Sequence, residues 1–165
     1  MTLHRSSKGI EDEMGRLEVG KDAVWSVSSS QEGFGVEELM DPSPDTYWKS
    51  CGALPHLITL QFKKRTTLDD LSVYLGHEVD RISIPTRLSI RCGRDLNHLQ
   101  EIKVVNLSNP CGLVSVPLYD GDGKFIKAKV LQIAVLEILG TSSYAKICHV
   151  KVYSPPENIG DELEY

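Results

Sequence analysis

Apolar and polar residues alternate along most of the chain, and this alternation predicts strands. Residues 58–62 place apolar side chains at every second position, and residues 71–75 repeat the pattern after a turn-like stretch at 63–67. A period of two puts one face of a strand in a core and the other in water. The pattern therefore predicts two half-buried strands joined by a turn at residues 63–67.

The same alternation predicts further strands along the chain. They cover residues 85–92, 102–107, 113–118, 130–136 and 147–153. Residues 130–136 are apolar on both faces, which places this strand in the middle of a sheet. One short helix is predicted at residues 36–40, ending before Pro42, which cannot continue it. Short strands, frequent turns and no long helix predict an all-β fold, an antiparallel β-sandwich or barrel.

The two ends of the chain differ from the alternating region. Residues 1–16 are polar and contain glycines, so we predict an N-terminal arm. Residues 156–165 begin at the second of two consecutive prolines and are rich in acidic side chains, so we predict an acidic, solvated C-terminal tail. Between them, residues 17–155 are expected to form one domain.

Composition narrows the class of protein. The chain has 165 residues, of which 41% are apolar and 25% charged, as in ordinary globular domains. Its 18 basic and 23 acidic residues give a formal net charge of −5, and the basic residues are scattered, so no nucleic-acid partner is expected. No stretch approaches the roughly 20 apolar residues that cross a bilayer, and the polar start has no apolar signal core. We expect no membrane contact and an intracellular location.

Residue types that bind metals lack the necessary spacing. The four cysteines are too far apart for a Cys-x-x-Cys pair, and the five histidines show no repeat such as His-x-x-x-His. The stretch Asp120-Gly121-Asp122-Gly123 resembles the start of a calcium loop, but Leu131 stands where a bidentate glutamate is required. We therefore predict a hairpin turn there, free and buried thiols, and neither metal nor cofactor.

No group of residues predicts catalysis. The serines at 26–30 have no identifiable base, and neither a Gly-x-Ser-x-Gly turn nor a glycine-rich phosphate loop occurs. Cys148 and His149 are neighbours on a predicted strand, so their side chains point to opposite faces. No catalytic residue is assigned, and a binding module is favoured over an enzyme. Trp25 and Trp48 either pack in the core or form a ligand platform, and core packing is favoured.

An ordered series of short motifs carries a family resemblance. It includes Ala23-Val24-Trp25-Ser26, Gly33-Phe34-Gly35-Val36, Asp45-Thr46-Tyr47-Trp48, Pro55-His56-Leu57, Leu88-Ser89-Ile90-Arg91, Val116-Pro117-Leu118 and Val150-Lys151-Val152-Tyr153-Ser154-Pro155. The series resembles the DOC domain of the anaphase-promoting complex subunit 10 family. The residues that the resemblance assigns to the structural motif are Trp25, Phe34, Tyr47, Trp48, Pro55 and His56.

This resemblance implies a galactose-binding-like jelly roll that is not an enzyme. It implies a processivity subunit of the anaphase-promoting complex (cyclosome), a ubiquitin ligase of the cell cycle, which holds destruction-box degrons (Arg-x-x-Leu) together with a propeller-shaped coactivator. The implied partners are cullin-type and tetratricopeptide-repeat subunits, the coactivator and destruction-box substrates. The implied location is nucleus and cytoplasm, and no cofactor is implied.

The resemblance also assigns degron contacts to loops 80–86 and 138–146. The residues are Asp80, Arg81, Ser83 and Ile84 in the first loop and Thr141, Ser142, Ser143, Tyr144 and Lys146 in the second. The family pattern of the first loop, Asp-Glu-Ser-Tyr-Thr-Pro-Ser, is matched only at Asp80 and Pro85. The pattern of the second, Asn-His-Gln-Asn-Gly-Arg-Asp-Thr-His, is not matched at any position. Contacts through backbone and hydroxyl groups, a changed degron preference or a shifted alignment of the loop each explain this difference.

Two further features bear on binding. The chain ends Glu162-Leu163-Glu164-Tyr165, where family members carry an Ile-Arg dipeptide that docks on a tetratricopeptide-repeat subunit. A carbohydrate-binding module on the same sandwich is the alternative function, because sugar sites combine exposed aromatic rings with fixed polar groups. Its candidate platform is Tyr144 with Trp48. The expected intracellular location argues against an extracellular lectin.

Overall fold

The structure is a computed structural model of the chain. It describes residues 15–43, 45–76, 82–108, 111–119 and 122–156, together with the backbone of residues 162–164. The predicted N-terminal arm therefore lies almost entirely outside the described residues. No helix among the described residues has the length and apolar character needed to cross a membrane.

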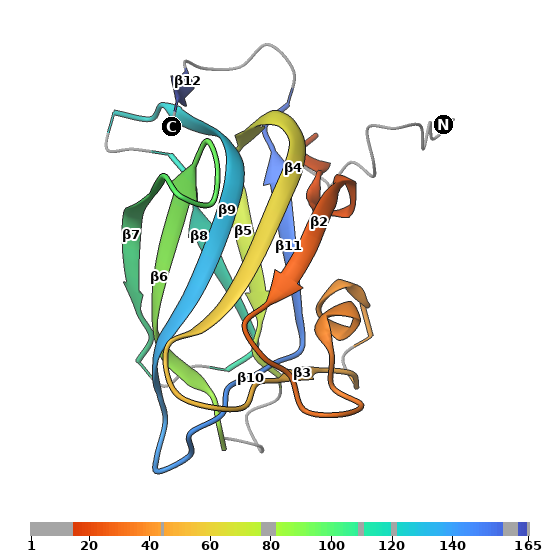
Figure 1. The fold of residues 1–165 in the computed structure, drawn as a ribbon. Helices are drawn as coiled ribbons and strands as arrows, with labels where there is room; N and C mark the ends of the chain where they lie inside the picture. Colours follow the sequence, from red (N-terminus) through yellow and green to blue (C-terminus); the bar gives the residue numbers. More distant parts are fainter. Residues whose placement is uncertain are drawn as a thin grey trace.

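Two sheets pack face to face (Figure 1). The larger sheet has the strand order β2 (Ala23–Val27), β4 (His56–Leu68), β9 (Phe125–Ile138), β6 (Pro85–Gly93) and β7 (Leu99–Asn106), and β12 (Glu162–Glu164) pairs with β9. The smaller sheet has the order β1 (Leu17–Glu18), β11 (His149–Ser154), β5 (Asp70–Tyr74) and β8 (Leu113–Pro117). A separate ribbon joins β3 (Trp48–Lys49) to β10 (Lys146–Ile147).

This arrangement confirms the predicted all-β sandwich. The strand pairs are antiparallel except for β12, which runs parallel to β9 in the segment predicted as a solvated tail. The predicted short helix is present as a 3₁₀ helix, η2 (Val36–Met40). A second 3₁₀ helix, η1 (Gly20–Asp22), was not predicted.

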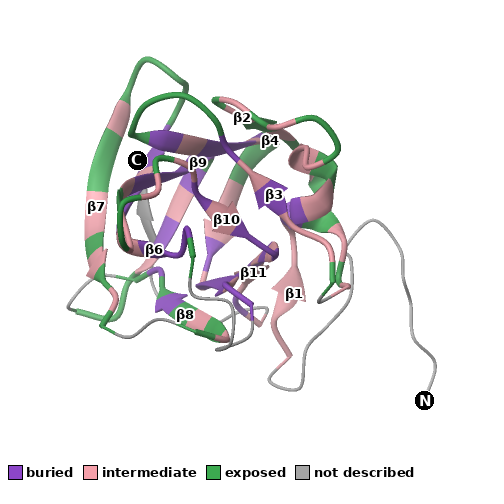
Figure 2. Cartoon of the chain, turned by 90° about the horizontal axis from the view of Figure 1, so that it is seen from below, coloured by how far each residue is buried: buried purple, intermediate pink, exposed green. Residues whose placement is uncertain are grey.

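Strand β9 lies between β4 and β6, and the core forms on its inner face. Leu131, Ile133 and Val135 are fully buried, and so is Ala134 on the other face of the same strand. Burial on both faces confirms that residues 130–136 belong in the middle of a sheet, as their nearly continuous apolar pattern, interrupted only by Gln132, predicts. Figure 2 shows this buried segment of β9 behind the loops.

The turn predicted at residues 63–67 is wrong. Strand β4 continues through this stretch to Leu68, and its pairing with β9 shifts register between Gln61 and Thr66. An irregularity of this kind adds residues to one strand and leaves them without partners in the ladder. Lys63, Lys64 and Arg65 are exposed there. The connection to β5 is Asp69 alone.

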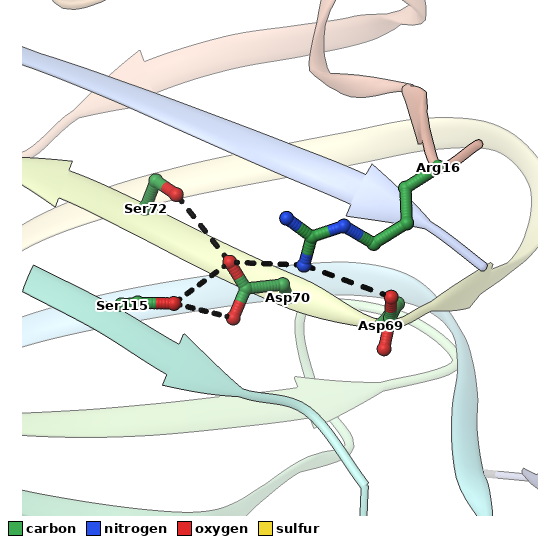
Figure 3. Close-up of polar contacts among 5 residues, drawn as sticks. All are labelled: Arg16, Asp69, Asp70, Ser72 and Ser115. Carbon is green, nitrogen blue, oxygen red and sulfur yellow. Dashed lines mark hydrogen bonds and ion pairs between the residues drawn. The ribbon is translucent and has the colours of Figure 1, made fainter. Parts of the chain in front are cut away.

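A buried carboxylate ties the start of the described chain to the smaller sheet (Figure 3). The Asp70 carboxylate accepts hydrogen bonds from the hydroxyls of Ser115, at 2.9 and 3.0 Å, and of Ser72, at 3.4 Å. The Arg16 guanidinium lies 3.5 Å from Asp70 and 3.7 Å from Asp69. It also covers the Tyr153 ring at 4.9 Å. These contacts fix the residue that precedes β1.

The prediction of buried thiols holds for two of the four cysteines. Cys92 and Cys148 are buried, and burial raises the pKa of the Cys92 thiol to about 12. Cys51 and Cys111 are exposed, which corrects the prediction for these two. Both lie in connections between strands, where no apolar periodicity places a side chain in the core. The first half of the turn predicted at 120–123 lies outside the described residues.

Candidate functional site

Two loops that the sequence assigns to degron binding meet at one end of the sandwich. Strand β6 begins at Pro85 and strand β9 ends at Ile138, and these two residues pair directly. Residues 82–84 and 139–145 therefore leave the larger sheet side by side, at the bottom of Figure 1, next to the ribbon β3–β10. We call this region, comprising residues 82–84, residues 139–145 and the ribbon, the loop end.

Hydrogen bonds join the two loops directly. The Leu139 amide donates to the Ile84 carbonyl at 2.8 Å, and the Lys146 amide donates to the Ser83 carbonyl at 2.9 Å. The Ser142 hydroxyl donates to the Tyr144 carbonyl at 3.3 Å, so Ser83 is the donor in its 2.6 Å contact with the Ser142 hydroxyl. The two loops are thus one connected unit, although they are far apart in the sequence.

Ser83 has an unusual backbone conformation. Its φ of 66° is the only positive value at a non-glycine position among the described residues, and its side chain is fully buried. A non-glycine residue in the left-handed region carries strain that its surroundings must offset. The hydrogen bonds to Ser142 and Lys146 offset this strain. Because both partners belong to the second loop, the same bonds also fix the position of that loop.

Two more buried polar side chains support the second loop. The Ser50 hydroxyl accepts from the Ala145 amide at 2.7 Å, and the Ser50 amide donates to the Ala145 carbonyl at 3.0 Å. His56 Nε2 lies 2.7 Å from the Ser143 carbonyl. A carbonyl only accepts, so Nε2 carries the proton. His56 Nδ1 is buried without a partner among the described residues.

The predicted degron contacts differ in how much surface they offer. Thr141 and Ser143 are exposed, whereas Ser142, Tyr144 and Lys146 are half-buried. Ser83 and Ile84 are buried, so their side chains stabilise the loop and offer no surface to a peptide. Asp80 and Arg81 lie outside the described residues. The assignment of degron contacts itself stays a prediction.

The motif residues occupy several places around this end. Trp48 is fully buried, and its indole nitrogen donates to the Ser29 carbonyl at 2.9 Å. Trp25 is half-buried and donates to the Gly20 carbonyl at 2.7 Å, away from the loops. The Leu54–Pro55 peptide bond is cis and leads into His56. Trp48 therefore packs in the core, which corrects its proposed place in a sugar platform.

Figure 2 shows the backbone of the ribbon, β3 and β10, at this end of the sandwich. Aromatic rings and two lysines lie together on its half-buried face. Phe34 and Tyr47 stack with ring centroids 5.3 Å apart. Lys49 Nζ lies 4.3 Å from the Phe34 centroid, and Lys146 Nζ lies 4.4 Å from that of Tyr47. No motif in the sequence points to Lys49 as a site residue. Its position next to the buried Trp48 indicates an outward side chain, because successive strand residues point to opposite faces.

The described residues contain no group of three or more histidine, cysteine or acidic side chains arranged to hold a metal. His149 lies outside the loops, and its ring stacks on Tyr74 at 4.9 Å. Burial lowers the pKa of His149, Lys151 lowers it further, and Asp41 opposes the shift. These features fit a structural histidine.

Comparison with known sequences gives consistent matches. The family model described as "Anaphase-promoting complex, subunit 10 (APC10)" matches residues 2–164. Anaphase-promoting complex subunit 10 of Drosophila melanogaster is 42% identical over 147 residues, covering 89% of this chain and 75% of the relative. The Homo sapiens protein of that name is 39% identical over 140 residues, covering 85% and 76%. That of Schizosaccharomyces pombe is 31% identical over 156 residues, covering 92% and 82%.

Solved structures of similar fold include carbohydrate-binding modules. The family 32 module of Clostridium perfringens NanJ, solved with galactose, has a TM-score of 0.70 and 15% identity over 82% of this chain and 96% of that one. Chitosan-binding module 1 from Paenibacillus sp. IK-5 has a TM-score of 0.67 and 15% identity over 83% and 98%. These likenesses show the fold alone, and they confirm the predicted galactose-binding-like jelly roll.

Proposed function

This chain belongs to the anaphase-promoting complex subunit 10 family, and from that premise we propose that it recognises destruction-box degrons for this ubiquitin ligase. In this role it is a non-catalytic subunit that acts together with the propeller coactivator. It lengthens the residence of a substrate while ubiquitin is added. The partners are then the cullin-type and tetratricopeptide-repeat subunits, and the place of action is the nucleus and cytoplasm.

One observation carries this proposal: the two loops expected to contact the degron form a single hydrogen-bonded unit. Buried side chains of Ser50, His56 and Ser83 make hydrogen bonds to the second loop on its core side. Thr141 and Ser143 remain exposed above them. A binding loop held by a rigid scaffold loses less conformational freedom when a ligand binds. This geometry favours contacts through hydroxyl and backbone groups, one of the explanations left open for the differences in these loops.

The direct experiment reconstitutes the ligase without this subunit and adds the chain back. Wild-type chain is expected to increase the number of ubiquitins added per substrate-binding event. The double variant Thr141→Ala with Ser143→Ala is expected to lose about fivefold in this processivity, because two exposed hydrogen bonds of about 0.5 kcal/mol each contribute about 1 kcal/mol together. Ser26→Ala, on the exposed face of β2, is the matched control. Unchanged processivity on adding wild-type chain contradicts the proposal.

Carbohydrate binding is a weaker candidate on this geometry. Of its two proposed platform residues, Trp48 is fully buried and only Tyr144 reaches the surface. Titration of the chain with galactose and chitosan oligomers, followed by NMR, separates the two functions. Shifts confined to the loop end on adding a sugar support the carbohydrate reading and argue against the degron one.

A further inference from the structure

Two lysines stand directly opposite each other on the ribbon at the loop end. Lys49 of β3 pairs with Lys146 of β10, so the two side chains share one face. Like charges directly across an antiparallel pair are destabilising. The ribbon has only two residues in each strand, so few other contacts within it offset this repulsion. A negative charge placed beside the two ammonium groups reduces this repulsion.

Aromatic rings hold the two ammonium groups in place. Lys49 Nζ lies 4.3, 5.3 and 5.8 Å from the ring centroids of Phe34, Tyr47 and Tyr144. Lys146 Nζ lies 4.4 Å from that of Tyr47, so both lysines contact one ring. Ring faces attract cations and restrict the long lysine side chains. All five residues are half-buried, which reduces the number of water molecules around the charges.

The positive charge of Lys49 has no carboxylate partner among the described residues. Its contacts there are the three rings, and no described acidic side chain lies within the 4.0 Å of an ion pair. The chain as a whole carries a formal charge of −5, so its general field repels acidic ligands. Binding of an acidic ligand therefore requires a local positive site of this kind.

The lysine pair lies next to the loops of the proposed degron site. The Lys146 amide bonds to Ser83, and Tyr144 of the second loop contributes its ring to Lys49. We propose that Lys49 and Lys146 bind the carboxylate of an aspartate or glutamate in the substrate peptide beside its destruction box. This inference rests on the proposed function and adds a preference for acidic flanking residues.

The test uses two peptides that differ only in charge. Both contain a destruction box; one carries aspartates on its flanks and the other asparagines at the same positions. In the assembled ligase with its coactivator, wild-type chain is expected to bind the acidic peptide about two- to fivefold more tightly, the range of a partly exposed ion pair. The variants Lys49→Gln and Lys146→Gln are expected to remove this difference, and Lys49→Arg to retain it.

The control is Lys63→Gln, which removes an exposed lysine from β4 away from the loop end. It is expected to keep the full preference. Equal binding of both peptides by wild-type chain, or a preference that survives both Lys49→Gln and Lys146→Gln, overturns the inference. The proposed function fails differently, because then neither peptide gains affinity when the subunit is added. NMR spectra of each variant confirm folding, and the Lys49→Arg result separates charge from packing.

Discussion

Two buried polar networks stabilise opposite ends of this sandwich with different chemistry. Away from the loops, the carboxylate of Asp70 pairs with Arg16 and accepts from Ser72 and Ser115. At the loop end, Ser50, His56 and Ser83 bond to the backbone or hydroxyls of the second loop. The first network depends on an ion pair, and the second consists of serine hydroxyls and an imidazole without an ion pair among the described residues.

The first network stabilises the fold, and the second positions a loop that is proposed to bind a ligand. A buried charge is costly without its partner, so the charged network strongly favours the one arrangement that pairs it. The second network fixes a loop backbone through serine hydroxyls and an imidazole. The two lysines of the ribbon therefore stand out electrostatically at the loop end, where a ligand is proposed to bind. The following variants test this comparison.

Loss of the charged partner is expected to have the largest effect. Asp70→Ala leaves Arg16 without the closer of its two carboxylate partners among the described residues, and two serine hydroxyls without this acceptor. The free energy of unfolding should fall by about 3 kcal/mol. Urea denaturation measures it, and Glu32→Ala, at an exposed turn, should change stability by less than about 0.5 kcal/mol. A loss no larger than that of Glu32→Ala contradicts a stabilising role for this network.

Removal of the His56 imidazole should lower the free energy of unfolding by less than Asp70→Ala does, and its effect should be confined to the second loop. His56→Ala removes the donor to the Ser143 carbonyl and leaves a small cavity, which should cost about 2 kcal/mol. Hydrogen exchange should accelerate at residues 139–146, while the strands of the smaller sheet remain protected. His98→Ala, at an exposed site, is the control. Acceleration spread evenly over both sheets argues against a local support.

Ser83 permits a comparison between two substitutions of the same residue. Ser83→Ala removes the bond to Ser142 and keeps the strained backbone, so it should lower stability by about 1 kcal/mol. Ser83→Gly also removes the bond but relieves the strain at φ 66°, which should recover about 0.5 kcal/mol. Thermal unfolding of both variants measures the order. The reverse order shows that backbone strain is not important here.

The smallest expected effect is a dependence on pH through His149. Its pKa in the folded chain is lowered from 6.5, chiefly by burial. As pH falls through 6.5, His149 takes up a proton in the unfolded chain before it does so in the folded chain. The free energy of unfolding therefore decreases towards acid pH. Urea midpoints from pH 8 to pH 5 should decrease less for His149→Gln than for wild type. Identical decreases contradict this assignment, and His98→Gln is the control.

Much of the fold could be predicted from the sequence, because the spacing of apolar residues indicates burial: alternation marks a half-buried strand, and a nearly continuous apolar run marks a strand buried on both faces. The middle strand β9 is an example, since residues 130–136 are apolar on both faces. The stretch 63–67 could not be predicted, because three consecutive charged residues look like a turn although the strand continues through a register shift. Local sequence does not contain the partner strand that stabilises such an irregularity.

The candidate site was predictable only in part. The family resemblance located both loops, and the structure brings them together. The role of Lys49 depends on its pairing with Lys146 and on the Phe34 and Tyr47 rings, which come from separate segments. Trp48 packs in the core, as favoured from the sequence, and only its alternative place in a sugar platform is wrong. Side-chain direction in these short ribbons is set by tertiary contacts.

The topology has a consequence for the folding of the chain during synthesis. An inner strand of each sheet comes from the later part of the sequence: β9 lies between β4 and β6, and β11 lies between β1 and β5. Leu17 pairs with Ser154, so β1 cannot pair until β11 has been synthesised. Such non-local pairing slows folding and leaves apolar edges open until late. A nascent chain that stops before residue 125 therefore lacks β9 and β11, an inner strand of each sheet, and their neighbouring strands have unpaired edges until translation passes β11.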